Sequence, residues 1–297
     1  MQMGQNQMLI RGDNMRFKKG IWFSLIMGLL ILSGCSRASN QPVKDVHQSY
    51  GASYVPTLFF HGYGSSANAE MHMINAAKSA GVTRTILRAT VAKNGHVTWR
   101  GQFKPGDHHP LVAVQFTDNR NSDYPQDATW AKRVITGLQK SYHITKFNVV
   151  GHSMGNMAIV YYLLANGQNR HLPQLQKEVD IAGHFNGILG VNDEPNRMTL
   201  SSAGKPNKMD HNYQQLLALR QRFPRQVQVL NIFGDLNNGT HSDGRVSNAS
   251  SQSLKYLVKQ RAATYQEHRI VGAEAQHSKL HDNAQVDQLL IQFLWHR

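Results

Sequence analysis

The stretch FNVVGHSMGNMAIVYYLLA, residues 147–165, decides the fold expected of this chain. A short strand pattern runs into Gly-His-Ser-Met-Gly, and apolar residues at helical spacing follow it. A serine at so tight a turn projects beyond the sheet on a strained backbone, and glycines two residues away on each side remove the collision between strand and helix. The pattern therefore predicts that Ser153 is a nucleophile beside the free N–H groups of a helix.

Strand and helix patterns alternate from residue 54 to the end of the chain. Strands are expected at residues 54–60, 83–92, 147–150, 178–185, 226–234 and 265–272. Helices are expected at residues 69–81, 125–143, 154–165, 212–223, 251–262 and 284–296. Residues 95–103 and 111–118 are expected to be extended and to form a hairpin at a sheet edge. The alternation predicts an α/β fold with a mostly parallel central sheet, helices on both faces, and one domain over residues 54–297.

A serine nucleophile needs a base and an acid that orients the base. Two aspartates follow the expected strand 226–234. Asp235 lies at the strand end, and Asp243 lies in Asp-Gly-Arg-Val, where the valine could fix the loop in the core. Two histidines, His277 and His281, precede the last helix. His281 is followed by Asp282 and Asn283, a sequence typical of the start of a helix. We favour Asp243 as the acid and His277 as the base, with Asp235 and His281 as the alternatives.

Two N–H groups are expected to face the oxyanion that forms during acyl transfer. One belongs to Met154, the residue after the nucleophile. The other is expected from Tyr63, in the glycine-rich turn His-Gly-Tyr-Gly that follows an early strand. These donors would complete a site for acyl transfer.

Patterns for metal binding are weak. Residues 235–243 faintly resemble an oxygen-ligand calcium loop, and His108 and His109 are adjacent, but neither segment has the spacing of a complete ligand set. We therefore expect no metal and no other cofactor.

The only cysteine, Cys35, closes the stretch MRFKKGIWFSLIMGLLILSGC, residues 15–35. A basic segment precedes an apolar run over residues 20–32, which is shorter than the roughly 20 residues of a membrane-spanning helix. Leu-Ser-Gly-Cys resembles the lipobox of bacterial lipoproteins. We expect residues 1–34 to be a signal peptide, with translation starting at Met1 or Met15, and residues 35–53 to be a lipidated tether. The alternatives are an uncleaved signal anchor and an ordinary secretory peptide.

The chain is strongly basic, with a formal charge of +14. Such a charge is compatible with an anionic membrane or an acidic cell-wall polymer as a partner, and equally with a solvated surface that has an excess of lysine and arginine. The basic residues are scattered and no nucleic-acid-binding motif is present, so nucleic acid is not an expected partner. A lipid anchor at Cys35 predicts a position on the extracytoplasmic face of the cell membrane. The sequence does not indicate an oligomeric state.

Five segments together resemble the α/β-hydrolase superfamily and, more narrowly, a group of bacterial cell-surface hydrolases with lipase-like features and no agreed substrate. They are HGYGSS (61–66), GHSMG (151–155), GDLNNGTHSDGRV (234–246), AQHSKLHDN (275–283) and FLW (293–295). The resemblance covers roughly residues 54–295. It implies a triad of Ser153, Asp243 and His277, an acyl-enzyme, and an ester substrate.

The function expected is that of a membrane-anchored serine hydrolase, a carboxylesterase or a lipase-like enzyme. The alternatives are an acyltransferase or peptidase on the same fold, and a binding lipoprotein without catalysis. The irregular residues 186–210 could form a lid. They are polar and contain Lys205 and Lys208, which argues against long-chain triglycerides as substrates.

Overall fold

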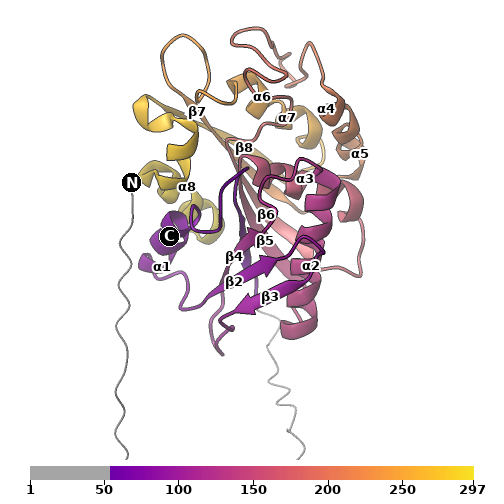
Figure 1. The fold of residues 1–297 in the computed structure, drawn as a ribbon, viewed down its shortest axis with the longest axis vertical. Coiled ribbons are helices and arrows are strands. Elements are labelled where there is room, and N and C mark those ends of the chain that lie inside the picture. Colours follow the sequence, from indigo (N-terminus) through magenta and orange to yellow (C-terminus); the bar gives the residue numbers. More distant parts are fainter. Residues whose placement is uncertain (1–53) are drawn as a thin grey trace, which may run out of the picture. The chain divides into compact units, whose positions relative to one another are not determined.

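An eight-stranded sheet lies at the centre of the structure, in the order β3-β2-β4-β1-β5-β6-β7-β8 (Figure 1). The computed structural model describes residues 54–297. The strands are β1 (Thr57–Phe60), β2 (Ile86–Val91), β3 (Val97–Arg100), β4 (Leu111–Phe116), β5 (Lys146–His152), β6 (Gln174–Ile181), β7 (Gln228–Asp235) and β8 (Thr264–Val271). Neighbouring strands are parallel except β2 and β3, which are antiparallel. The expected α/β fold with a mostly parallel sheet is confirmed.

The strand pairing corrects the hairpin expected from residues 95–118. Strand β3 pairs with β2 through the turn at Gly95, whereas β4 lies between β2 and β1 inside the sheet. The physical reason is burial. Nearly every residue of β4 is buried, as an inner parallel strand requires, while β3 alternates half-buried and exposed residues, as an edge strand does.

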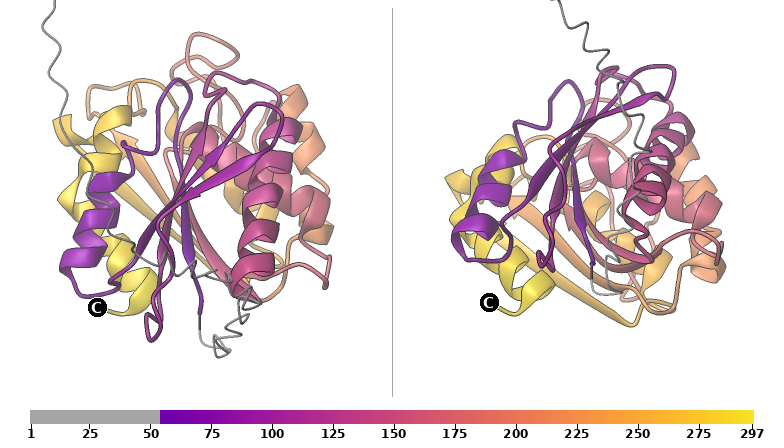
Figure 2. Two further views of the ribbon diagram at one scale, coloured as in Figure 1. Left: turned by 60° about the horizontal axis from the view of Figure 1, so that its bottom comes forward. Right: turned by 90° about the horizontal axis from the view of Figure 1, so that it is seen from below.

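Helices cover both faces of the sheet, as Figure 2 shows. The helices α1 (Met71–Ser79) and α8 (Ala284–Trp295) lie on one face with the 3₁₀ segments η1 (Ala273–Ala275) and η2 (His277–Asp282). The helices α2 (Tyr124–Tyr142), α3 (Met154–Asn166), α4 (His211–Leu216), α5 (Leu219–Arg222), α6 (Asn248–Gln252) and α7 (Leu254–Val258) lie on the other. The sheet therefore separates two apolar cores, one around Phe59 and Leu290 and the other around Trp130 and Phe147.

Two of the expected helices are interrupted. Residues 212–223 form α4 and α5, and residues 251–262 form α6 and α7. At both interruptions the backbone hydrogen bonds span three residues, as from Leu217 N–H to the Gln214 carbonyl. Two of the long helices begin at a capping side chain: Asp123 accepts from the Gln126 N–H before α2, and Asn283 accepts from the Gln285 N–H before α8.

The loops that carry the expected site residues all leave the carboxyl ends of parallel strands. The turn 61–64 follows β1, the serine turn follows β5, and residues 236–247 and 272–283 follow β7 and β8. The irregular segment 186–210 follows β6. Because the carboxyl ends of parallel strands lie at one edge of a sheet, these loops meet there.

The signal peptide, the lipidation at Cys35 and the tether expected over residues 1–53 lie outside the described residues. None of the helices formed by residues 54–297 has the length and apolar character needed to cross a membrane.

Candidate active site

Ser153 occupies the sharp turn between β5 and α3. Its backbone angles are φ 53° and ψ −116°, a conformation that is unfavourable for a residue with a side chain. Three hydrogen bonds hold it there. The Ser153 N–H donates to the Ile181 carbonyl at 2.9 Å, and the Asn156 side chain donates to the carbonyls of Ser153 and Ile181 at 3.0 and 2.9 Å. The strained serine is therefore fixed by β6 and by the first turn of its own helix.

The two glycines of the motif are required by close packing. A Cβ at Gly151 would lie 2.5 Å from Asn156 Oδ1, and a Cβ at Gly155 would lie 2.2 Å from the carbonyl oxygen of Phe60. Both distances are far below contact distance. The glycines thus allow α3 to start directly against β1 and β5, which places the Ser153 hydroxyl beyond the sheet.

The structure brings Ser153, His277 and Asp243 into one chain of hydrogen bonds. His277 Nε2 lies 2.9 Å from Ser153 Oγ, and His277 Nδ1 lies 2.7 Å from Asp243 Oδ2. The other Asp243 oxygen, Oδ1, accepts the N–H groups of Arg245 and Val246 at 2.8 and 2.7 Å. The His277 N–H also donates to the Asp243 carbonyl at 2.9 Å. The Asp243 carboxyl is buried, so its orientation toward the imidazole is fixed.

The competing aspartate supports the same loop without touching His277. Asp235 Oδ1 accepts the Asn237 N–H at 2.9 Å, and Asp235 Oδ2 accepts from the Asn248 side chain at 2.9 Å. Arg269 lies 3.5 Å from Oδ2. Burial opposes ionisation of this carboxyl, but these hydrogen bonds and the charge of Arg269 outweigh it and lower the pKa of Asp235.

His281, the alternative base, does not form a hydrogen bond with Ser153. His281 packs its ring edge against His152, with ring centroids 4.9 Å apart, and its Nδ1 lies 3.5 Å from Asp282. It lies beside His152 and forms no hydrogen bond with the Ser153 hydroxyl. Among residues 54–297, no group of three or more His, Cys, Asp or Glu side chains is arranged to hold a metal ion.

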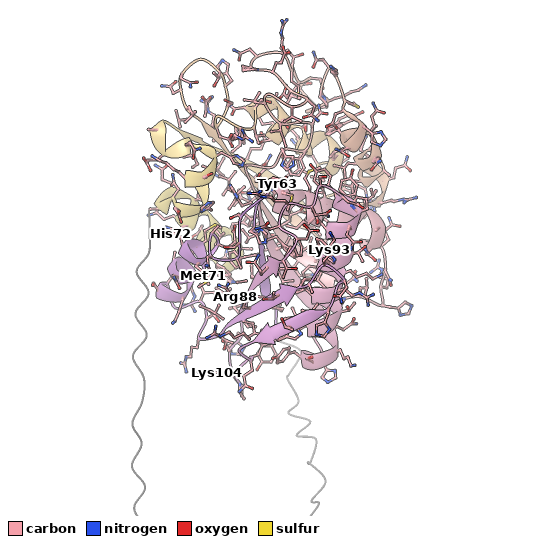
Figure 3. All side chains as sticks on the ribbon, in the orientation of Figure 1. Tyr63, Met71, His72, Arg88, Lys93 and Lys104 are labelled. Carbon is pink, nitrogen blue, oxygen red and sulfur yellow. The ribbon has the colours of Figure 1, made fainter. Side chains whose placement is uncertain are left out.

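The turn after β1 lies against the serine. A Cβ at Gly62 would be 3.2 Å from Ser153 Cβ, and the turn is fixed by a hydrogen bond from the Gly64 N–H to the Asn119 carbonyl at 2.7 Å. Neither the Tyr63 N–H nor the Met154 N–H donates to a protein acceptor in the described part of the chain. Both donors are thus available to a substrate oxygen. Figure 3 labels Tyr63, whose exposed ring lies at the end of the sheet where these loops gather.

His152 was not anticipated as a site residue, because it fills the variable position of the serine motif. Its buried ring lies between His277 and His281, and its Nε2–H donates to the His277 carbonyl at 3.0 Å. Burial and the neighbouring histidines lower the pKa of His152 well below its usual value. The ring is therefore a neutral donor that holds the backbone of His277.

Tyr124 and His184 form a second pair, for which no sequence pattern was evident. The Tyr124 hydroxyl lies 3.1 Å from His184 Nε2. Burial, with a smaller effect of His277, lowers the pKa of His184 to about 3, so this ring is neutral at physiological pH. Both residues line the cavity over Ser153. They give its wall a polar, uncharged section.

The cavity over Ser153 has a volume of about 580 Å³. Its walls include Ser153 and His277, which are expected to belong to the triad, and both expected oxyanion donors. Ile188 and Val191 of the irregular segment line it as well, and the side chains of Val191 and Tyr63 are 75% and 60% exposed at its mouth. The site is thus an open pocket with a partly apolar rim, of a size suited to a small ligand.

The segment 186–210 is irregular, as expected, and hydrogen bonds connect it to the loop that carries Asp243. The Leu189 N–H donates to the Arg245 carbonyl at 2.9 Å, and Asp193 accepts a short hydrogen bond from the Ser247 hydroxyl. A second cavity of about 570 Å³ lies within the segment and shares Val191 with the cavity over the serine. The segment therefore forms part of the pocket wall.

Comparison with known proteins identifies the family. The family described as alpha/beta hydrolases of unknown function (DUF915) matches residues 44–297. Comparison with proteins of curated function found no match. The crystal structure of the lin2722 gene product from Listeria innocua is similar, with a TM-score of 0.75 and 24% identity over 82% of this chain and 95% of that chain. A "putative cell surface hydrolase" from Lactobacillus plantarum WCFS1 has a TM-score of 0.66 and 20% identity over 82% and 91%.

Proposed function

The chain belongs to the DUF915 family of α/β-hydrolases, and on this premise we propose that it hydrolyses carboxylic esters through Ser153, His277 and Asp243. The observation that carries the proposal is the unbroken hydrogen-bond chain from Ser153 Oγ to the Asp243 carboxyl, at 2.9 and 2.7 Å. A structural serine in a turn needs neither a buried histidine nor a buried aspartate behind it. The arrangement is that of an activated nucleophile.

The first half of the reaction forms an acyl-enzyme. His277 Nε2 takes the hydroxyl proton as Ser153 Oγ attacks the ester carbonyl, and Asp243 stabilises the resulting imidazolium through Nδ1. The N–H groups of Tyr63 and Met154 face the carbonyl oxygen as it becomes negative. Two such donors typically lower the barrier by several kcal/mol. His277 then passes the proton to the alcohol that leaves.

The second half releases the acid. Water takes the place of the alcohol, His277 removes a proton from it, and the hydroxide attacks the acyl-serine carbonyl. The same N–H groups stabilise the second oxyanion, and Ser153 recovers its proton from His277. Every proton transfer uses one imidazole and no cofactor takes part.

We also propose that the enzyme acts at the outer face of the cell membrane, held by a lipid on Cys35. The support for this lies in the sequence of residues 15–35, which has the basic segment, the apolar run and the single cysteine of a lipoprotein leader. Metabolic labelling with a clickable fatty acid would test it. Cys35→Ser is expected to lose the label and the membrane association together.

Labelling with a fluorophosphonate, which reacts with activated serines, tests the proposed chemistry. Wild type should be labelled and should hydrolyse 4-nitrophenyl esters, and Ser153→Ala should lose the label and at least about a thousandfold of kcat/KM. Ser141→Ala, which alters an exposed serine near the end of α2, is the matched control. An unlabelled, inactive wild type with a normal unfolding transition would refute the proposal and favour a binding protein.

A further inference from the structure

The charged residues of the described part of the chain are divided between surface and core. Six of the chain's 32 Lys and Arg residues precede residue 54, which leaves 26, and none of these is buried. Two of the 18 acidic residues precede residue 54, which leaves 16. Nine of these are buried: Glu70, Asp107, Asp127, Glu178, Asp180, Asp193, Asp235, Asp243 and Asp287. The surface of residues 54–297 therefore carries 26 basic side chains against seven acidic ones.

Several buried carboxyls also lose their negative charge. Burial raises the pKa of Glu70 to about 8 and that of Asp127 to about 7, and it raises the pKa of Glu178 and Asp180 well above the usual range. These groups are partly or fully protonated near neutral pH. They offset the basic surface less than a formal count suggests, so the molecule attracts anions. Figure 3 labels three of the surface cations, Arg88, Lys93 and Lys104, near β2 and β3.

The cavity over Ser153 also has more positive than negative charge along its walls. No Asp or Glu side chain is among the described residues that line it, whereas Arg245 is. Arg120 lies nearby, with its Nε 3.6 Å from the position of a Cβ on Gly64 in the oxyanion turn. Nearby carboxylates are already engaged: Asp118 pairs with Lys93 at 3.3 Å, and Asp123 caps α2. The carboxylates of the adjoining cavity are engaged too: Asp193 accepts from Ser247, Glu194 pairs with Arg197, and Asp210 caps α4. An anion over Ser153 would therefore meet Arg245 and no lining carboxylate among the described residues.

Arg245 combines a fixed backbone with a free side chain. Its N–H donates to Asp243 Oδ1 at 2.8 Å, and its carbonyl accepts from the Leu189 N–H at 2.9 Å. Its exposed guanidinium forms no ion pair or hydrogen bond with any residue in 54–297. A guanidinium offers five donors in a plane that match a carboxylate or a phosphate. The loop that carries the proposed acid thus also holds an unused anion-binding group at the cavity.

We propose that the substrate of this site is an ester that carries an anionic group, a carboxylate or a phosphate, and that Arg245 binds this group. The inference rests on the proposed function, because it assigns a substrate class to the Ser153 site. Arg245 is a specificity-determining residue in this scheme. It binds the charged part of the substrate at a distance from the reacting carbonyl, and Arg120 adds attraction at the rim.

Matched pairs of esters test the inference on the purified full-length chain in a nonionic detergent. On the acyl side, mono-4-nitrophenyl adipate is compared with 4-nitrophenyl hexanoate, which has the same chain length without the carboxylate. On the alcohol side, 4-acetoxybenzoate and 4-acetoxyphenyl phosphate are compared with methyl 4-acetoxybenzoate. The quantity measured is the ratio of kcat/KM for the anionic ester to that for its neutral partner. Comparing this ratio between variants cancels the intrinsic reactivity of each ester.

Wild type should prefer at least one anionic ester, and Arg245→Gln should lower that ratio by about ten- to a hundredfold, the usual range for a charge-assisted hydrogen bond to a carboxylate or phosphate. Arg245→Lys should keep part of the preference, because the charge remains without the planar donors. Arg225→Gln removes the same charge from an exposed residue just before β7, at the opposite end of the sheet. It should leave the ratio within about twofold. Substitution keeps the Arg245 N–H, so the contact with Asp243 survives in every variant.

Three outcomes would overturn the inference while the proposed function stands. Wild type could hydrolyse the neutral esters through Ser153 without preferring an anionic one. Arg245→Gln could lower both members of a pair equally, which would make Arg245 structural. Arg225→Gln could lower the ratio as much as Arg245→Gln, which would assign the effect to overall charge. If instead Ser153 neither labels nor turns over any ester, the proposed function fails and the inference fails with it.

Discussion

At the scale of single residues, the contact between His277 and Asp243 is the one on which the proposed chemistry depends most. Asp243 accepts from two backbone N–H groups and faces the imidazole at 2.7 Å. Asp235, eight residues earlier, is bound by Asn237, Asn248 and Arg269 instead. We therefore expect the two aspartates to have separate tasks: Asp243 would orient the proposed base, and Asp235 would fix the loop.

Exchange of each aspartate for asparagine should separate these tasks. Asp243→Asn is expected to lower kcat by about three to four orders of magnitude, because an amide cannot hold the required imidazole tautomer or stabilise the imidazolium. Asp235→Asn should keep most of the activity and lower the free energy of unfolding by about 1–3 kcal/mol, because it loses the charge that Arg269 faces. Ester hydrolysis and urea unfolding of both variants check this. The reverse pattern would assign the acid to Asp235.

Only some of the residues around Ser153 could be named from the sequence. Ser153, Asp243 and His277 could be proposed because a motif and the order of the strands restrict their positions. His152 and His184 could not. His152 fills a position of the motif that any residue can occupy, and His184 reaches the pocket only because of the irregular path that the chain takes after β6. Such contacts depend on tertiary packing and leave no local pattern.

At the scale of elements, the strand-to-helix turn was predictable because its sequence pattern is local. The packing that requires the two glycines is local only in part: a Cβ at Gly151 would meet Asn156 in the turn itself, whereas a Cβ at Gly155 would meet Phe60 of the neighbouring strand β1. The partner of β4 was not predictable in the same way. Strands that are distant in the sequence can pair with one another, and an apolar run such as residues 111–116 is compatible both with an inner strand and with one arm of a hairpin. The breaks in the helices expected over residues 212–223 and 251–262 could not be predicted either, because the apolar spacing continues across them.

Substitution of Gly155 should show how closely the elements approach. A Cβ there would lie 2.2 Å from the Phe60 carbonyl oxygen, so Gly155→Ala must push α3 away from β1. We expect a loss of at least about 3 kcal/mol in the free energy of unfolding, or failure to fold. Gly239→Ala is the control: its φ is 85° and its added Cβ would meet nothing within 4 Å, so only about 1–2 kcal/mol is expected. Equal urea midpoints for the two variants would contradict the packing argument.

At the scale of the whole molecule, the distribution of charge is a property that composition does not reveal. The sequence shows an excess of basic residues, but it does not show that nine of the sixteen acidic residues in 54–297 are buried. Both oxygens of Glu70, Glu178 and Asp180 are buried without a hydrogen-bond partner. A buried carboxyl in this state is stable only when it is protonated. The same burial that leaves the surface basic should therefore lower the free energy of unfolding as the pH rises.

This sensitivity has a definite direction. Burial raises the pKa of Glu70 from 4.5 to about 8, and a nearby Asp282 adds to the shift. Below pH 4.5 the group is protonated in both the folded and the unfolded chain. Between pH 4.5 and 8 the unfolded chain releases the proton and the folded chain keeps it, so the free energy of unfolding falls by about 1.4 kcal/mol per pH unit at most. Asp127, raised from 3.8 to about 7, acts in the same direction over a lower range.

The free energy of unfolding is thus expected to be highest on the acid side of neutrality and to decrease steadily up to about pH 8. Urea unfolding of wild type, Glu70→Gln and the exposed control Glu194→Gln, at pH 5 to 9, measures the slope. Glu70→Gln should make the dependence on pH shallower, because a neutral amide of the same shape has no proton to lose. The control should follow wild type. If Glu70→Gln leaves the pH dependence of the free energy of unfolding unchanged, Glu70 must be ionised in the folded protein, in contact with solvent or a cationic partner. The pH dependence would then come from the other buried carboxyls, Glu178 and Asp180 on β6.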